Sequence, residues 1–395
     1  MADPGTGRRQ RSTPPSVPVG VPAGRYFGIP VYFSASWFIF AAFITISWAP
    51  VVREYVAVSN GVSYVVAFSF ALLLGVSVLL HELGHCVVSR ILGLRVRRVV
   101  LFLLGGVSEI ENEPERPAHE YLVAVAGPLV SLLLAAIGAA AYPIVASGSV
   151  ARWLVVQLMV SNVLVMAFNL LPGLPLDGGR VLRAAVWQLT RSQLAGTKAA
   201  VWGGRIIAIA IMVFVVTGIF PRNGDQRLST VLIALLLASF IWFNASQSMQ
   251  MATMREALPK LRLADVVRPL IEVPPEISIG EAVRRARDSH AGAVLAVDRH
   301  GRPESIVSES AILTIPEHRR PWTALSEVAR QLEPGLLLQE SLSGQRLVQA
   351  IQAMPATEYL VVGGDSRPVG VLVAADLAQH FNGLLAGGAA AVPGR

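Results

Sequence analysis

Long apolar stretches alternate with short polar segments over the first 250 residues of the chain. Six of these stretches are long enough to cross a bilayer, which takes roughly 20 residues in a helix. They run over about 35–52, 62–93, 118–147, 151–171, 199–219 and 228–248. The pattern predicts a polytopic α-helical membrane protein with about six transmembrane helices, in a domain of residues 26–255.

The pattern changes after residue 255. Residues 256–385 mix charged residues with short Val/Leu-rich strands, which is typical of a soluble α/β domain. This region matches itself at an offset of 65, because AVLAVDRHGRPESIVSESAI (293–312) lies over EYLVVGGDSRPVGVLVAADL (358–377). Each copy is expected to fold as helix, strand, turn, strand and helix, in two repeats of about 256–320 and 321–385.

The two ends of the chain lack such patterns. Residues 1–25 contain no apolar core, so we expect a disordered basic arm rather than a cleaved signal peptide. The Ala/Gly-rich residues 386–395 are expected to form a flexible tail.

Charge fits a membrane protein and predicts its orientation. Only 15% of the residues are charged, against about 25% in soluble domains. Basic residues cluster in three segments that share one side of a six-span protein: Arg8, Arg9, Arg11 and Arg25; Arg90, Arg95, Arg97 and Arg98; Arg180, Arg183, Arg191 and Lys198. The positive-inside rule then predicts a multi-pass protein of the cell membrane, with both termini and the soluble domain on the cytoplasmic side. Because the basic residues are scattered around the spans, we expect no nucleic-acid partner.

The stretch LLHELGHCVV (79–88) places three ionisable side chains inside an apolar run. His81 and His85 are four residues apart, so on a helix they share a face and can hold one zinc. Glu82 lies beside the first ligand, where it can act as a general base. The alternative is a pair of structural histidines, which would need partners for three polar groups in hydrocarbon. Cys86, the single cysteine, excludes an intramolecular disulfide.

A catalytic zinc generally has three protein ligands. The best candidate for the third is Asp177 in FNLLPGLPLDGGR (168–180), where prolines and glycines must unwind the backbone at the end of an apolar helix. Irregular backbone at membrane depth is tolerated only inside the protein or beside water. His119, which opens the third span, remains the alternative ligand.

HELGH in one span and N-x-x-P-x-x-x-x-D-G-G in a later one resemble the site-2 protease family of intramembrane zinc metalloproteases, over most of residues 26–250. The resemblance implies His81, His85 and Asp177 as zinc ligands, Glu82 as the catalytic base, and Asn169 as a substrate-binding residue. Asn162, two turns earlier, is a candidate for orienting substrate or a ligand, and a structural interhelical hydrogen bond is an equally good interpretation.

The segment Leu104–Ser108 follows the catalytic helix and contains Gly105 and Gly106. In the family a comparable stretch forms a hairpin that pairs with the substrate as an added strand, so the resemblance implies that both glycines bind substrate. An ordinary Gly-Gly turn is the alternative. AGPLVS (126–131) resembles the family's small-residue stretch in the third span, and it also favours close helix packing.

The soluble repeat resembles a cystathionine-beta-synthase (CBS) domain pair. Nucleotide-binding members carry Ser or Thr and then Asp three residues later, after the last strand; here one copy has Ser308 with Ala311, and the other Val373 with Asp376. Asp376 is therefore a candidate for binding an adenosine nucleotide. The alternative is a structural or dimerising pair without a ligand. The pair resembles the CBS-bearing subgroup, which is related to the sporulation protease that processes a sigma-factor precursor.

The resemblance implies a zinc metalloendopeptidase with one zinc per chain. It would hydrolyse peptide bonds in or near transmembrane segments of single-span proteins, such as an anti-sigma factor or another membrane-tethered regulator, in regulated intramembrane proteolysis. A homodimer through the CBS pair is expected. A CBS-regulated transporter or channel is the main alternative, and an inactive member that only binds its clients is the second.

Overall fold

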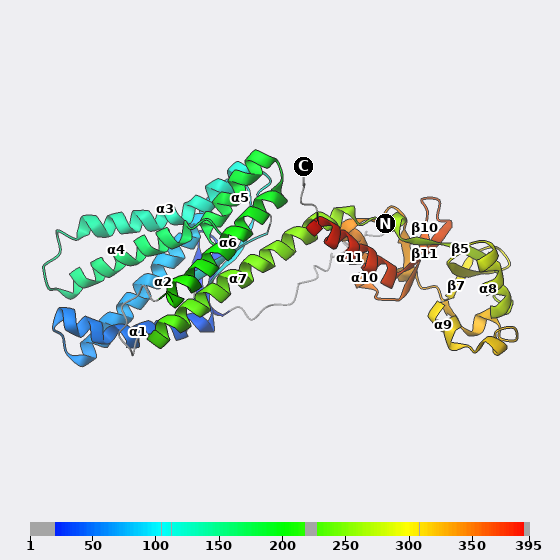
Figure 1. Cartoon of the computed structure of the whole chain (residues 1–395), viewed down its shortest axis with the longest axis horizontal. Coiled ribbons are helices and arrows are strands. Elements are labelled where there is room, and N and C mark those ends of the chain that lie inside the picture. Colours follow the sequence, from blue (N-terminus) through cyan, green and yellow to red (C-terminus); the bar gives the residue numbers. More distant parts are fainter. Residues whose placement is uncertain (1–19, 104, 112, 218–226, 308, 391–395) are drawn as a thin grey trace, which may run out of the picture. The chain divides into compact units, whose positions relative to one another are not determined.

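The computed structural model describes residues 20–103, 105–111, 113–217, 227–307 and 309–390. The chain divides into two compact units, Met1–Met249 and Gln250–Arg395. Figure 1 shows the helical membrane unit in blue to green and the sheet-containing unit in yellow to red.

Six helices of the described residues are long and apolar enough to cross a membrane, so the expected six spans are confirmed. They are α1 Ala35–Val56, α2 Asn60–Ile91, α3 Pro117–Ala141, α4 Val150–Asn169, α6 Gln193–Val216 and α7 Arg227–Ala257. The seventh helix of this unit, α5 Asp177–Thr190, is amphipathic and too short to span. The sequence pattern did not predict α5, because its apolar positions are interrupted by Arg180 and Arg183.

Helix α2 carries the H-E-x-x-H motif and ends in a defined cap. Gly93 adopts φ 82°, its N–H donates to the Arg90 carbonyl, and Leu94 N–H donates to the Ser89 carbonyl. These two bonds form a Schellman motif, in which glycine supplies the left-handed conformation that stops the helix. The chain therefore turns directly into the strand that follows α2.

The membrane unit also contains a four-stranded sheet with the order β1-β2-β3-β4. Its strands are β1 Val21–Tyr26, β2 Ile29–Phe33, β3 Val96–Phe102 and β4 Gly105–Ile110. Strand β2 pairs with β3 in parallel, the other two pairs are antiparallel, and β4 is an edge strand. Buried residues of β2 and β3 pack against Leu79, Leu83 and Cys86 of α2, so the sheet lies against the motif helix.

Two expectations about the chain ends were wrong at their boundaries. The disordered arm was expected to reach residue 25, but Val21–Tyr26 forms β1 because it pairs along its length with β2. The flexible tail was expected from residue 386, but α11 continues to Ala390. The rest of both segments, 1–19 and 391–395, lies outside the described residues.

The soluble unit has a seven-stranded sheet with the order β8-β7-β6-β5-β11-β10-β9. One copy contains β5 Val267–Val273, α8 Ile279–Asp288, β6 Ala293–Val297, β7 Pro303–Val307 and α9 Glu309–Thr314, and β8 Ala329–Gln331 follows it. The other contains β9 Leu337–Gln339, α10 Gly344–Ala353, β10 Glu358–Val362, β11 Pro368–Val373 and α11 Ala374–Ala390. Helix α10 and strand β10 begin 65 residues after α8 and β6 (279 to 344, 293 to 358), at the offset of the sequence repeat.

Candidate metal and catalytic centre

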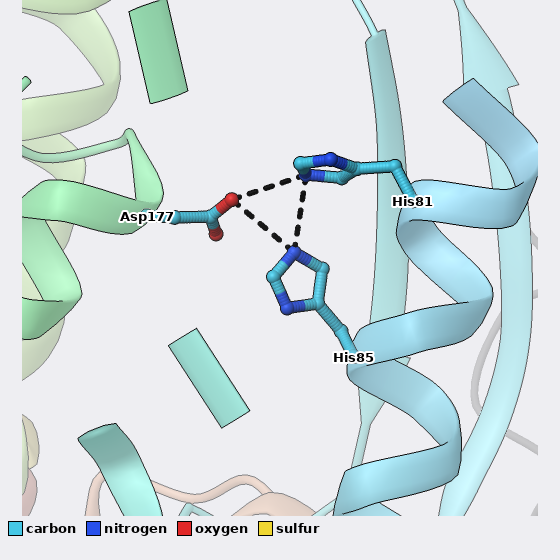
Figure 2. A group of neighbouring side chains, drawn as sticks. All are labelled: His81, His85 and Asp177. Carbon is cyan, nitrogen blue, oxygen red and sulfur yellow. Dashed lines mark hydrogen bonds and ion pairs between the residues drawn. The ribbon is translucent and has the colours of Figure 1, made fainter. Parts of the chain in front are cut away.

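Three buried side chains meet between α2 and the start of α5. His81 Nε2 lies 3.1 Å from Asp177 Oδ2, His85 Nε2 lies 3.2 Å from the same oxygen, and the two Nε2 atoms are 3.3 Å apart. Figure 2 shows both imidazoles pointing from successive turns of α2 toward the Asp177 carboxylate. The three potential ligand atoms therefore form a nearly equilateral triangle.

This triangle has the dimensions of one face of a tetrahedral metal site. With metal–nitrogen bonds of about 2.0–2.1 Å, neighbouring ligand atoms of tetrahedral zinc lie about 3.3 Å apart. Among the described residues, His81, His85 and Asp177 are the group of His, Cys, Asp and Glu side chains that could hold a metal ion. Two imidazoles and one carboxylate are a donor set that suits zinc.

The outer nitrogens of both rings are held by α3. His85 Nδ1 lies 2.7 Å from the Val123 carbonyl oxygen, and His81 Nδ1 lies 2.9 Å from Ser131 Oγ. A carbonyl oxygen only accepts, so Nδ1 of His85 carries a proton, and whenever the ring is neutral Nε2 presents its lone pair toward Asp177. Lone pairs of Nε2 and of the carboxylate this close repel each other unless a cation lies between them. The site is therefore built for a cation.

Gly127 of α3 leaves the space that the imidazoles occupy. A Cβ atom at this position would lie 2.3 Å from His85 Nε2 and 2.5 Å from His81 Nε2. Gly84, between the two histidines, similarly allows α2 to approach α3, since a Cβ there would lie 3.0 Å from the Ala126 carbonyl oxygen. The small residues of AGPLVS therefore serve both helix packing and the shape of the site.

Asp177 is positioned by a tightly packed loop and by a helix start. A Cβ at Gly178 would lie 2.2 Å from the Leu170 carbonyl oxygen, and one at Gly173 would lie 2.3 Å from Gly204 N of α6. The loop is also tied to α6 by the Leu174 N–H, which donates to the Ala200 carbonyl at 2.9 Å. As the first residue of α5, Asp177 places its negative charge at the positive end of the helix dipole.

A buried ion-pair cluster fixes α5 against α3. The Glu120 side chain is fully buried, and its Oε1 lies 2.9 Å from Arg180 Nε and 2.7 Å from Arg183 Nη2. The two arginines are three residues apart and share a face of α5. This cluster, which we call the Glu120 clamp, lies one helical turn after Asp177 and orients the helix that carries it.

Glu82 faces the edge strand of the membrane sheet. Ser108 Oγ of β4 donates a hydrogen bond to Glu82 Oε2 at 2.6 Å. A Cβ at Gly106 would lie 2.4 Å from Glu82 Cγ, so the absence of a side chain at this position makes room for the glutamate. The predicted base and the predicted substrate-binding glycines therefore lie side by side.

The hairpin expected after the catalytic helix is formed by β3 and β4. Gly105 opens β4 opposite Phe102, and Gly106 pairs with Leu101. Gly105 adopts φ 145°, a conformation that favours glycine. Leu104, also predicted to belong to this segment, lies outside the described residues.

Three other candidate residues are not members of the His81, His85 and Asp177 group. His119 lies in the first turn of α3, and among the described residues it does not join the metal-binding group. Asn162 is buried and donates to Ser77 Oγ of α2 at 3.2 Å, which is the structural interhelical bond. Asn169 is the last residue of α4. Its side chain makes no hydrogen bond within the described part of the chain.

In the soluble unit, Asp376 is held by an arginine. Arg268 Nε lies 2.6 Å from one carboxylate oxygen of Asp376, and its Nη2 lies 2.9 Å from the other. These hydrogen bonds hold the pKa of Asp376 below its usual value. A ribose hydroxyl would have to share these two oxygens with Arg268, since each oxygen keeps a further lone pair. Ser308, the matching half-motif of the other copy, lies outside the described residues.

Sequence reasoning missed the groups that orient the predicted ligands. Gly127 and Ser131 lie in AGPLVS, for which the sequence indicates a family stretch and close packing but no contact with the histidines, and the sequence assigns no role to Glu120. The available signals were a carboxylate inside the start of an apolar helix and two arginines at i, i+3 behind D-G-G. The Val123 carbonyl is a backbone group, so the sequence carried no signal for it.

Comparisons with known proteins agree with the motifs. A model of Peptidase family M50 matches residues 69–148 and 143–214, and a CBS domain model matches residues 263–318. A protein of Synechocystis sp. whose name describes a zinc metalloprotease, sll0528, is 34% identical over 258 residues. That match covers 64% of this chain and 65% of the relative, so the chain spans about two thirds of its length.

Rip3 of Mycobacterium tuberculosis, also named as a zinc metalloprotease, is 29% identical over 91% of this chain and 92% of its own. A solved site-2 protease from Methanocaldococcus jannaschii shares 26% identity, with a TM-score of 0.41 over 58% of this chain and 94% of that chain. The region that carries the HELGH and D-G-G motifs therefore matches peptidase family M50, the site-2 protease family, and a region that matches a CBS domain follows the last span.

Proposed function

We propose that this protein is an intramembrane zinc metalloprotease that cleaves peptide bonds in or near transmembrane segments of single-span membrane proteins. The observation that carries the proposal is the triangle of His81, His85 and Asp177, with edges of 3.1–3.3 Å and a glutamate next to the first histidine. The names of both curated relatives as zinc metalloproteases support the choice of metal and of activity.

The protein's own residues divide the work. His81, His85 and Asp177 would hold one zinc per chain. The chemistry that a bound zinc supplies is Lewis acidity, which makes water nucleophilic near neutral pH. Glu82 accepts a proton from the attacking water and returns it to the leaving amine, as a general base and then a general acid. The hydrogen bond between His81 and Ser131, and the one that His85 donates to the Val123 carbonyl, keep the imidazoles in their binding orientation.

Substrate would bind in extended form at the hairpin. A helix shields its own peptide bonds, whereas an edge strand such as β4 offers unpaired backbone groups to a second extended chain. Gly105 and Gly106 are the first two residues of this edge strand, and Gly106 lies against Glu82. We propose that they bind the substrate backbone beside the base, and that Asn169 contacts the substrate at the end of α4.

We propose that the protein lies in the cell membrane with both termini and the CBS pair in the cytoplasm, as the distribution of basic residues favours. His81 is ten residues from the last residue of α2, so water would reach the site from the cytoplasmic side. The substrates would be membrane-tethered regulators, including anti-sigma factors, in regulated intramembrane proteolysis.

The role of the CBS pair is best described as structural or dimerising. The Arg268–Asp376 contact supports this interpretation over a nucleotide site, because it gives the Asp376 carboxylate a structural partner within the protein. Isothermal titration of the whole protein with AMP and with ATP tests it: no binding is expected, and saturable binding abolished by Asp376→Asn would establish the nucleotide site. Light scattering in mild detergent should report a dimer.

The central test is cleavage of single-span reporter peptides by purified protein in detergent. Glu82→Gln should abolish cleavage and retain zinc, because it removes the base and no metal ligand. A solute flux that survived Glu82→Gln would favour the transporter alternative. Reporter capture by the wild-type protein without cleavage would favour the client-binding alternative.

A further inference from the structure

Glu82 is held at one oxygen by the strand that would receive the substrate. Ser108 Oγ lies 2.6 Å from Glu82 Oε2, and this is the one hydrogen bond that the Glu82 carboxylate makes within the described residues. Ser108 is on β4, the edge strand, and it shares a face with Gly106, two residues earlier. Glu82 is partly buried, so this bond is shielded from bulk water.

The surroundings of Ser108 define the direction of this hydrogen bond. The Cys86 thiol, one turn after Glu82 on α2, lies 3.3 Å from Ser108 Oγ and donates to it. Oγ accepts from the thiol, and its own proton goes to the carboxylate oxygen at 2.6 Å in preference to the Glu82 backbone carbonyl at 3.4 Å. The serine hydroxyl therefore links α2 to β4 at the position of the predicted base.

Gly106 restricts the carboxylate from the same side. A Cβ there would lie 2.9 Å from Glu82 Cδ and 3.0 Å from Oε1, so the glutamate packs against bare backbone. One carboxylate oxygen is thus bound by Ser108, and the other, Oε1, remains without a partner in the described part of the chain. A base that must accept one proton from water needs one free oxygen in a defined place.

We infer that Ser108 is a positioning residue for Glu82, and that it couples the orientation of the base to the strand that binds substrate. The inference rests on the proposed function. It goes beyond the motif, because H-E-x-x-H contains nothing that fixes the glutamate rotamer. An incoming extended chain that pairs with β4 would shift this strand. Ser108 would then move with the strand, and the Glu82 carboxylate would follow its hydrogen-bond donor.

Ser108→Ala tests the inference on any reporter peptide that wild type cleaves and Glu82→Gln does not. We expect kcat to fall on the order of tenfold to a hundredfold, the range for loss of a hydrogen bond to a charged group. KM and the zinc content should be unchanged, because the serine side chain binds neither substrate nor metal. Ser108→Thr keeps the hydroxyl and suits a strand, so it should restore kcat.

A matched control is Ser69→Ala, which removes a hydroxyl from the exposed face of the same helix α2, where its one hydrogen bond within the described residues goes to the Val65 carbonyl. It should leave kcat unchanged. Infrared spectroscopy gives a readout that needs neither substrate nor metal. The carboxylate bands that Glu82→Gln removes should shift in Ser108→Ala and return in Ser108→Thr.

The outcomes separate the two claims. Wild-type kcat in Ser108→Ala, or an equal fall in Ser108→Thr, would overturn this inference and leave the proposed function intact. A raised KM with normal kcat would also overturn it, since that is the effect of a hairpin residue that serves only substrate binding. If wild type cleaves no reporter while the infrared shift is found, the proposed function fails and the contact has only a structural role.

Discussion

At the scale of single residues, the site depends on groups that bind the ligands rather than on the ligands alone. Each imidazole is fixed at Nδ1 by α3, and the space for Nε2 exists because residue 127 is glycine. Outer hydrogen bonds of this kind set the tautomer and orientation of metal-binding histidines. Two substitutions test these contacts separately.

Ser131→Ala removes the hydroxyl that holds His81 Nδ1. We expect zinc affinity to fall about 10–100-fold, the usual effect of losing an outer partner of a metal ligand. Competition with a fluorescent chelator measures it. Ser161→Ala on α4, whose hydroxyl bonds to the Leu158 carbonyl of its own helix, is the control. Equal affinities in the two variants would contradict the role of Ser131.

Gly127→Ala should remove most of the zinc while the protein still folds. The new methyl carbon would lie 2.3 Å from His85 Nε2, so the imidazole must leave its place. Gly61→Ala on α2 is the matched control, because a Cβ there meets nothing within 4 Å. Elemental analysis and circular dichroism compare the variants. Full zinc content in Gly127→Ala would show that the imidazoles bind metal elsewhere.

At the scale of elements, α5 and the sheet position the chemistry. The Glu120 clamp holds α5 by two charge-assisted contacts of 2.7 and 2.9 Å to one buried carboxylate oxygen. Strand β4 brings the other half of the site, since it contacts Glu82 at two positions on one face. Neither element crosses the membrane, yet each presents residues to the centre.

Glu120→Gln should destabilise the membrane unit by about 3–5 kcal/mol, the range for removing one partner of a buried ion pair. It leaves Arg180 and Arg183 without their shared carboxylate. The temperature of unfolding in detergent should fall, and zinc should be lost along with the position of Asp177. Glu111→Gln, at a more exposed pair with Arg97, should change neither. Unchanged stability in Glu120→Gln would mean that the clamp does not hold α5.

The hydrophobic pattern was sufficient for the six spans and for the repeat, because both depend on periodicity that the sequence carries directly. It was insufficient for β1, β2 and α5. Strand β2 pairs in parallel with β3, with Val31 opposite Val99, so its partner is distant in sequence and that information is not local. The motif residues His81, Glu82, His85 and Asp177 were predicted from spacing and resemblance, and the structure brings the two histidines and the aspartate together.

At the scale of the whole molecule, a membrane unit with a metal-binding centre is joined to a CBS unit with its own sheet. The two internal repeats of the CBS unit share one sheet, because β5 of the first repeat pairs antiparallel with β11 of the second. Arg268 of β5 and Asp376 of α11 bridge the copies beside this pairing. This ion pair gives the soluble unit a testable response to pH.

The Asp376 carboxylate has a lowered pKa in the folded protein, so it stabilises the fold above the unfolded pKa of about 3.9. That contribution is lost as the pH falls from this value through the lower folded pKa. Wild type should therefore unfold at a slightly higher temperature than Asp376→Asn at pH 7, and the difference should shrink as the pH falls below the unfolded pKa of about 3.9. The difference will be small, because both side chains are about one-third exposed. A difference that grew on acidification would contradict this assignment.

The measurement that tests the central claim most directly is zinc per chain, by elemental analysis of detergent-purified protein, in wild type beside Asp177→Ala. The account predicts about one zinc per wild-type chain and a clear loss in Asp177→Ala, because the triangle loses one of its three ligand atoms. Stoichiometric zinc in Asp177→Ala would assign the third ligand elsewhere, with His119 as the first candidate. Freshly purified wild-type protein without zinc would contradict the metalloprotease assignment itself.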